Sequence, residues 1–359
     1  MDQIAGVYGN SNRDEYLSTT RVRHRDSSLI IELADGSRHS FRVPGRPSKV
    51  TLAQIPAEFK LNVSRTRAGG GVVNSRLAAH AIARALGKAN EIRTLDANER
   101  DSVVESEVPQ PIRYLDLRPC PRNYVLGSRA DKWILRSPLH LVAPHSRFQH
   151  GPLGWLCEAR TLLINSPKDV KPVAAIIEEW RHRPFEIIFV ATPSLPPLFL
   201  KNILPLASVV IGAWDDLQFL TGDTPVTIAG ARTMAARLRH VAPDADVHIT
   251  MGDRGVISMP ARSLDCVHVE LLRNSAAAVE TRAVIARGPA RLCGAGDAFA
   301  AGVMVRRAFD WSLMCGVNGY GRHVHDALGG CTSALHWIGI PCVGVDAFTI
   351  RSIPVPKCA

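Results

Sequence analysis

The sequence lacks the residue patterns that mark disulfide-rich, zinc-binding and membrane-spanning proteins. Its eight cysteines form no Cys-x-x-Cys pair and no Cys/His spacing typical of a metal site, so we expect reduced thiols. No apolar run approaches the roughly 18 residues that a membrane-spanning helix needs. The first residues contain no basic stretch followed by an apolar one, which is the pattern of a secretory signal. We therefore expect a cytoplasmic protein.

Two common nucleotide-binding motifs are absent as well. The chain contains no G-x-x-x-x-G-K-[ST] sequence, which excludes a P-loop. The consecutive glycines Gly69, Gly70 and Gly71 do not have the G-x-G-x-x-G spacing of a dinucleotide-binding turn, and no convincing strand directly precedes them. Any nucleotide must therefore be bound by a different glycine-rich segment.

The charge of the chain favours an anionic small molecule over a nucleic acid. The 359 residues carry a formal net charge of +10, but Lys and Arg are spread along the chain and accompany no nucleic-acid-binding module. With 46% hydrophobic and 21% charged residues, the composition is that of a folded globular protein. Nucleic-acid binding rests on the net charge alone, and we do not expect it.

From residue 161 onward, short β-rich runs alternate with amphipathic segments. The runs TLLIN, FEIIFVAT, ASVVIGA and DVHITMG are separated by helix-like segments such as KPVAAIIEEWRHR and TIAGARTMAARLRHV. This alternation predicts a mainly parallel sheet with helices on both faces and ligand sites at the carboxyl ends of its strands. We expect further strands in GVISMP, CVHVELL and AAVETRAVIA, and strands and loops in the less regular stretch from 88 to 160.

The N-terminal part predicts a strand followed by a small β flap. IAGVYG is a short apolar run that ends in turn-forming residues, which would place Asp14 at the carboxyl end of a strand. Residues 29 to 43 contain two β-rich runs separated by Asp35-Gly36, which is a strong hairpin signal.

Two glycine-rich segments each lead into a predicted helix. In the first, Gly69, Gly70 and Gly71 precede small and apolar residues at helical spacing, and Gly87 would end that helix. In the second, RLCGAGDAFAAGV, glycines would expose unpaired N–H groups at a helix N-terminus, where an anion such as phosphate binds well. Asp297 in this segment is either a helix cap or a base that accepts a proton from a hydroxyl attacking a phosphate.

These segments resemble the two signatures of the ribokinase-like, or PfkB, family of carbohydrate and nucleoside kinases. Gly69, Gly70 and Asn74 match the first signature and GAGDAFAAG matches the second, in the family's order. GNSNRD and HITMGDRGV are similar to weaker elements of the family. The resemblance implies a three-layer α/β/α fold with a mainly parallel central sheet and a small β lid. It also implies a single kinase domain over 1–359, with inserted lid strands within about 15–68.

The resemblance further implies a reaction and the residues that carry it. The reaction is transfer of the γ-phosphoryl group of ATP, with Mg²⁺, to a hydroxymethyl group of a sugar or nucleoside. Asp297 would be the catalytic base, and the backbone N–H groups of Gly294, Ala295 and Gly296 would stabilise the transferred group. The other implied site residues are Asp14, Gly69, Gly70 and Asn74 for the acceptor, and Thr250, Gly252 and Gly255 for the nucleotide.

The chain departs from the family pattern near the metal and at the start of the second signature. Ala213 and Asp216 stand where the family usually has asparagine and glutamate, which leaves Asp216 as the candidate magnesium ligand. Arg291, Leu292 and Cys293 replace the residues that usually begin the second signature. These departures leave a second hypothesis open, in which the protein is a catalytically impaired ligand-binding or regulatory protein.

Two further expectations concern the acceptor and the assembly. Many family members that act on ribose or phosphosugars have a lysine where this chain has Gly71, which favours an uncharged sugar or a nucleoside here. Lid strands in the family often pair between subunits, so the resemblance also implies a homodimer formed through the lid.

Overall fold

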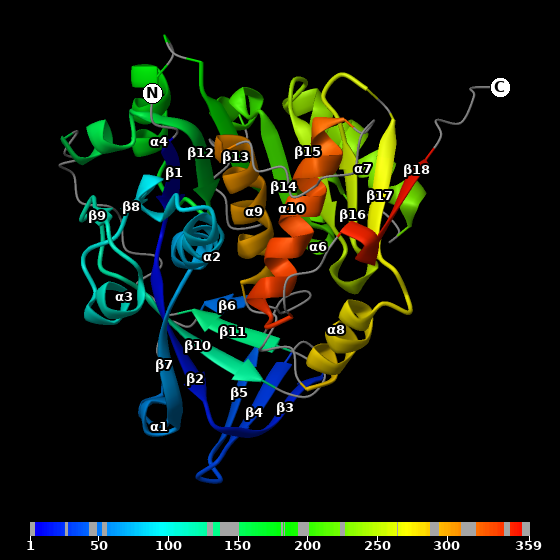
Figure 1. Cartoon of the computed structure of the whole chain (residues 1–359). Helices are drawn as coiled ribbons and strands as arrows, with labels where there is room; N and C mark the ends of the chain where they lie inside the picture. Colours follow the sequence, from blue (N-terminus) through cyan, green and yellow to red (C-terminus); the bar gives the residue numbers. More distant parts are fainter. Residues whose placement is uncertain are drawn as a thin grey trace.

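The computed structural model of the chain describes residues 4–25, 28–42, 49–51, 56–127, 132–136, 151–180, 182, 184–192, 201–222, 227–263, 265–287, 294–309, 321–340 and 345–353. A ten-stranded sheet runs through the middle of the molecule, and two smaller sheets of five and three strands lie at one end of it (Figure 1). In spatial order, the strands of the large sheet are β18 (Phe348–Ile353), β17 (Cys266–Leu271), β16 (Val256–Met259), β15 (Asp246–Thr250), β14 (Val209–Ala213), β13 (Glu186–Val190), β12 (Ala159–Asn165), β1 (Ile4–Gly9), β8 (Ile92–Asp96) and β9 (Ile112–Tyr114).

The large sheet is mainly parallel, as the sequence predicts. Neighbouring strands from β9 across to β15 all pair in parallel, and β16, β17 and β18 extend the sheet with antiparallel pairs. Parallel neighbours bring their carboxyl ends to the same edge of the sheet. The loops that follow β1, β12, β13, β14 and β15 therefore meet at that edge.

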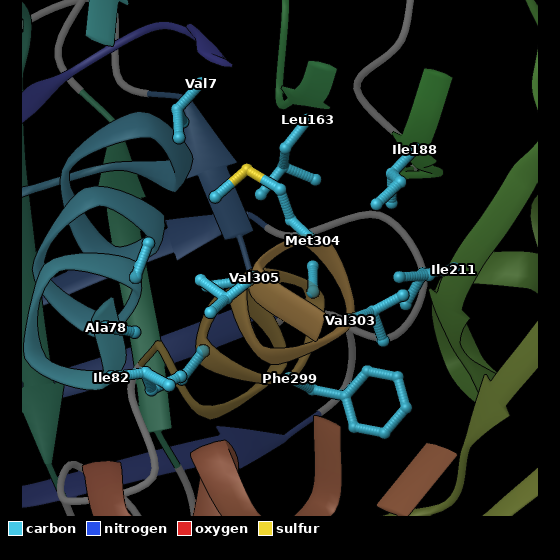
Figure 2. Close-up of a cluster of buried hydrophobic side chains, with 14 of the residues drawn as sticks. Val7, Ala78, Ile82, Leu163, Ile188, Ile211, Phe299, Val303, Met304 and Val305 are labelled. Carbon is cyan, nitrogen blue, oxygen red and sulfur yellow. The ribbon is translucent and has the colours of Figure 1, made fainter. Parts of the chain in front are cut away.

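Helices cover both faces of the large sheet because its strands send alternate side chains to opposite sides. In β1, for example, Val7 belongs to one buried cluster and Tyr8 to the other. The helices on the Val7 face are α2 (Gly71–Ala85), α9 (Ala295–Phe309) and α10 (Arg322–Trp337), and those on the Tyr8 face are α4 (Val170–Trp180), α6 (Trp214–Thr221) and α7 (Ile228–Val241). Figure 2 shows Val303 and Met304 of α9 packed among Val7, Leu163 and Ile211 of the sheet.

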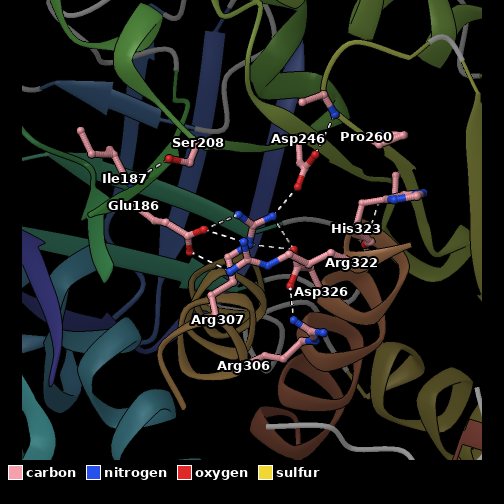
Figure 3. A network of polar contacts seen from close by, with 12 residues as sticks. Glu186, Ile187, Ser208, Asp246, Pro260, Arg306, Arg307, Arg322, His323 and Asp326 are labelled. Atoms are coloured by element: carbon pink, nitrogen blue, oxygen red, sulfur yellow. Dashed lines mark hydrogen bonds and ion pairs between the residues drawn. The ribbon is translucent and has the colours of Figure 1, made fainter. Parts of the chain in front are cut away.

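The C-terminal end of α9 is anchored by buried ion pairs (Figure 3). Arg306 and Arg307 lie 3.1 Å and 2.6 Å from the carboxylate of Asp326 in α10, whose side chain is 0% exposed. Arg307 also contacts the carboxylates of Asp246 and Glu186 from the large sheet. These ion pairs connect α9 to both α10 and the large sheet.

The two smaller sheets, which we call the lid, pack against each other. The five-stranded sheet contains β6 (Lys49–Thr51), β11 (Lys132–Arg136), β10 (Arg122–Gly127), β2 (Asn12–Leu17) and β7 (Val63–Gly69), and the three-stranded sheet contains β3 (Thr19–Arg25), β4 (Ser28–Leu33) and β5 (Arg38–Arg42). Alternate residues of β4, namely Leu29, Ile31 and Leu33, are buried in one cluster with Tyr124 and Leu126 of β10. The hairpin predicted within 29–43 is present as β4 and β5.

Two local predictions are wrong. The run AAVETRAVIA, expected as a strand, lies in helix α8 (Ala276–Ala286), because Ser275 caps its N-terminus by accepting a hydrogen bond from the N–H of Ala278 and the segment is rich in alanine. Asp14 does not lie at the carboxyl end of β1. That strand ends at Gly9, and Asp14 lies inside the lid strand β2.

Two short helices, α1 (Ala57–Leu61) and α3 (Ser102–Glu107), lie beside the lid. Phe59 of α1 is buried in the same cluster as Tyr124, and α3 packs near β7.

In the part of the chain that the structure describes, no helix combines the length and the apolar character that crossing a membrane requires. Among the described residues, Cys120, Cys157, Cys266 and Cys331 form no disulfide bond.

Candidate active site

A cavity of about 210 Å³ lies between the carboxyl edge of the large sheet and the lid. Its wall is built from the loops after the parallel strands, the first turns of α2 and α9, and the lid strands β2, β10 and β11. The residues expected in a site from the sequence that line this cavity are Asp14, Gly70, Asn74, Asp216, Thr250, Gly294, Gly296 and Asp297. The structure therefore gathers in one place residues that lie far apart in the sequence.

Close contacts with neighbouring atoms require glycine at positions 69 and 70. Gly70 has a φ of +91°, and a Cβ added there would lie 2.6 Å from the carbonyl oxygen of Asn10. A Cβ on Gly69 would clash with the carboxylate of Asp14. Only glycine at both positions lets the chain pass from β7 into α2 while the Asp14 side chain lies beside it.

Asp14 is held at the cavity wall by two amide groups. The side-chain nitrogens of Asn12 and Asn123 both donate hydrogen bonds to one of its oxygens, the latter at 3.0 Å. Asp14 is only 7% exposed, and Asn123 comes from the neighbouring strand β10. These donors fix the orientation of the carboxylate and leave it lining the cavity.

Asp297 lies in the first turn of α9 and also receives two amide donors. The helix begins at Ala295, so Asp297 lies inside the helix and not at the cap position. Asn74 donates to one carboxylate oxygen at 2.8 Å, and Asn165 donates to the other at 2.9 Å. The Asn165 amide also bonds the hydroxyl of Ser75 at 2.9 Å, which ties this part of α2 to the end of β12.

The N-terminus of α9 presents its first backbone N–H groups to the site. Gly294 and Gly296 line the cavity, and the carbonyl oxygen of Gly294 accepts the helical hydrogen bond from Ala298 at 2.8 Å. The first N–H groups of a helix have no partner within the helix, and the helix dipole adds partial positive charge there. This end of α9 suits an anionic group placed beside Asp297.

A second cavity, of about 330 Å³, adjoins the first. The two share Ala213, Thr250 and Gly296 in their walls. The second wall is largely apolar, with side chains such as Val256, Val269, Leu271, Phe299, Leu335 and Ile338. It also includes Ala295, Gly252 and Gly255, so every residue expected to bind nucleotide lies around this cavity. A flat apolar group such as a nucleobase fits such a wall.

Two cationic side chains line the first cavity. Arg136 comes from the lid strand β11, and Lys168 comes from the loop after β12. Burial, followed by the guanidinium groups of Arg136 and Arg118, lowers the pKa of the Lys168 ammonium group to about 7. Arg118 itself is paired with Asp169, whose two carboxylate oxygens lie 2.5 Å and 2.7 Å from one guanidinium nitrogen.

The candidate magnesium ligand, Asp216, lies in the first turn of α6 and lines the first cavity. Ala213, one turn earlier, lines both cavities and supplies no ligand atom from its side chain. Among the described residues, no group of three or more His, Cys, Asp or Glu side chains could hold a metal ion by itself. Arg291, Leu292 and Cys293 lie outside the described residues.

Asn123, Arg136 and Lys168 line the cavity and Asn165 contacts Asp297, but none of these four residues follows from the sequence motifs. Asn123 and Arg136 lie in the irregular stretch between 88 and 160, where no motif distinguishes them. Asn165 and Lys168 follow the run TLLI, and the position of a polar residue at the carboxyl end of a strand is the one signal that could have indicated them.

Comparison with known proteins gives a match in structure and none in sequence. Neither a protein-family model nor a curated protein matches the chain. The ribokinase of Arabidopsis thaliana, solved with ribose and ATP, matches with a TM-score of 0.61 at 12% identity, over 97% of this chain and 96% of the other. The adenosine kinase of Anopheles gambiae matches with a TM-score of 0.61 at 15% identity, over 94% and 99% of the two chains. Phosphofructokinase-2 of Escherichia coli, solved with fructose-6-phosphate, matches with a TM-score of 0.56 at 13% identity, over 97% of each chain. These nearly full-length matches show that the chain has the ribokinase-like α/β fold of these kinases.

Proposed function

We propose that the protein transfers the γ-phosphoryl group of ATP to a hydroxymethyl group of a sugar or nucleoside. The observation that carries this proposal is the position of Asp297. Its carboxylate lies in the first turn of α9, between the helix N-terminus that suits a phosphoryl group and a polar cavity that holds Asp14 and Asn74. A base, an anion site and an acceptor site thus lie within one cavity.

In the proposed step, the acceptor hydroxyl oxygen attacks the γ-phosphorus, and the bond from that phosphorus to the β–γ bridging oxygen breaks. Asp297 takes the hydroxyl proton, and ADP leaves with the bond electrons. The backbone N–H groups of Gly294, Ala295 and Gly296 donate to the oxygens of the transferred group. Asp14, Gly69, Gly70 and Asn74 hold the acceptor, with Asp14 accepting hydrogen bonds from its hydroxyl groups.

The second cavity is the proposed nucleotide site. Thr250, Gly252 and Gly255 lie around it, and its apolar wall suits the adenine ring. The Arabidopsis ribokinase that shares the fold was solved with ATP, which supports this assignment. Because Gly296 borders both cavities, a triphosphate bound in the second would extend toward Asp297.

Magnesium fits the site through Asp216. Mg²⁺ commonly takes one or two protein carboxylates and fills its other positions with phosphate oxygens and water. Asp216 supplies one such carboxylate at the cavity wall, so a metal bound mainly through the nucleotide agrees with the residues present. When bound, the ion would neutralise charge on the phosphates.

The test is the rate of phosphoryl transfer by the Asp297→Asn variant, measured with ATP and a panel of sugars and nucleosides. Removal of the base is expected to lower kcat by about 10²–10⁴-fold. The matched control is Asp265→Asn, an exposed aspartate in the loop before β17, which should retain the wild-type rate. Turnover by Asp297→Asn at the wild-type rate would exclude Asp297 as the base.

The second candidate function is ligand binding without catalytic turnover. It is suggested by Ala213, which lines the cavity at a position where the ribokinase-like family usually has an asparagine. Isothermal titration with ATP and magnesium, followed by the acceptor panel, separates the two functions. Tight binding of ATP with no phosphorylated product from any acceptor would favour this second candidate.

A further inference from the structure

We propose that the acceptor carries an anionic group, a phosphate or a carboxylate, and that Arg136 and Lys168 bind this group inside the first cavity. The proposal rests on the proposed function, because it assigns the charge of the molecule that the kinase would phosphorylate. It departs from the expectation of an uncharged acceptor that follows from Gly71.

The two cations come from opposite sides of the cavity. Arg136 is the last residue of β11 in the lid, and Lys168 follows β12 in the large sheet. Both line the first cavity, and neither lines the second. A group bound between them would contact the lid and the sheet at once.

Arg136 and Lys168 lie close enough to repel each other. The guanidinium group of Arg136 is one cause of the lowered pKa of Lys168, together with burial and Arg118. Asp169, which raises the pKa of Lys168, is also paired with Arg118. Asp216 raises the pKa of Arg136. Two partly desolvated cations repel each other, and a bound anion would relieve that repulsion.

The acceptor is favoured over the nucleotide as the source of the anion. Arg136 and Lys168 share their cavity with Asp14, Gly70 and Asn74, which are proposed to hold the acceptor. The loop after β15, where the nucleotide would bind, lies around the other cavity. Fork-shaped guanidinium groups bind phosphate and carboxylate through two parallel hydrogen bonds, and a lysine adds a point charge.

The experiment is calorimetric titration without nucleotide. Fructose 6-phosphate is compared with fructose, gluconate with glucose, and inorganic phosphate is titrated alone. We expect each anionic sugar to bind the wild-type protein at least about tenfold more tightly than its neutral partner. Arg136→Gln and Lys168→Met should each remove most of that preference. The matched controls are Arg42→Gln on the exposed surface of the lid and Lys171→Met on the exposed surface of α4, and both should keep it.

The outcomes separate an acceptor site from a nucleotide site. Equal binding of charged and neutral partners, or no binding by any of the anions, overturns the proposal. If the two variants weaken ATP binding in a parallel titration and leave the anion preference unchanged, the pair belongs to the nucleotide site and the proposal is also wrong. Binding is measured without turnover, so an anion preference that depends on Arg136 and Lys168 would stand even if no acceptor were phosphorylated and the proposed kinase activity failed.

Discussion

The side-chain amide of Asn165 donates a hydrogen bond of 2.9 Å to the carboxylate of Asp297, across 132 residues of sequence. Asn165 is the last residue of β12 and is fully buried, so it cannot turn away to solvent. With Asn74 on the other oxygen, it fixes the plane of the carboxylate relative to the cavity. We infer that Asn165 positions the proposed base without contacting the acceptor.

Replacement of Asn165 by alanine should therefore lower kcat by about 10–100-fold, because a misplaced base loses its alignment with the acceptor hydroxyl. KM for the acceptor should change little, since Asp14 and Asn123 keep their contacts. Steady-state kinetics with the best acceptor of the panel give both constants. Asn90→Ala, an exposed asparagine outside the site, serves as the control. A large rise in KM with kcat unchanged would show that Asn165 binds the acceptor instead.

The turn at Gly70 should not accept a side chain. At a φ of +91°, alanine would be strained and its Cβ would press on the carbonyl group of Asn10. We expect Gly70→Ala to lower the free energy of unfolding by about 1–3 kcal/mol and to raise KM for the acceptor. Denaturant unfolding and kinetics measure the two effects. Gly154→Ala, where an added Cβ meets no atom within 4 Å, should change neither quantity.

Binding of an anion at Lys168 should depend on pH. An ordinary lysine keeps its charge to about pH 10, but Lys168 has a pKa of about 7, set by burial and by Arg136 and Arg118 against Asp169 and Cys120. The charge is present below this pKa and is lost as the pH rises through it. The affinity for gluconate, whose carboxylate titrates near pH 4, should therefore fall by about tenfold between pH 6 and 8.5.

The Lys168→Met variant supplies the control for that measurement, because it has no ammonium group to titrate. Its calorimetric affinity for gluconate should be weak and nearly constant over the same pH range. A pH dependence that persists in the variant would assign the titration to another group.

The ion pairs at the end of α9 should contribute strongly to stability. Asp326→Asn removes the carboxylate that Arg306 and Arg307 share in a buried place. Leaving buried arginine charge without this partner should lower the free energy of unfolding by about 3–5 kcal/mol, measured by urea unfolding. Asp244→Asn breaks a pair with Arg262 in which both side chains are exposed, and should leave the unfolding midpoint unchanged. Equal stability of the two variants would contradict the role assigned to Asp326.

Much of the fold follows from local sequence patterns. The alternation of buried strands with amphipathic helices predicts the parallel sheet, and Asp35-Gly36 predicts the β4–β5 hairpin, because each pattern is decided by neighbouring residues. The strand predicted at AAVETRAVIA is wrong because two local signals in that segment oppose each other. Its β-branched residues favour a strand, but the Ser275 cap and the run of alanines outweigh them.

The sequence predicts only some of the residues that form the site. Asp297 and Gly70 belong to motifs whose glycines have a direct physical reason, so the sequence indicates them. Arg136 and Lys168 line the cavity, and Asn165 contacts Asp297, only through the pairing of β12 in the large sheet and of β11 in the lid. Such positions depend on contacts between segments far apart in the chain, which no local pattern contains.

The burial of α9 has a consequence for how the protein would move during turnover. Every residue from Ala298 to Ala308 is buried, and Asp326 holds the far end of the helix, so the base at its near end is part of a rigid body. Asp14 instead lies on β2, a lid strand joined to the large sheet by the short segment after Gly9. Any closure of the lid would therefore carry the acceptor toward a stationary base, and bending would fall in the connections between the lid strands and the rest of the molecule, including residues 9–12, 69–71 and 114–122.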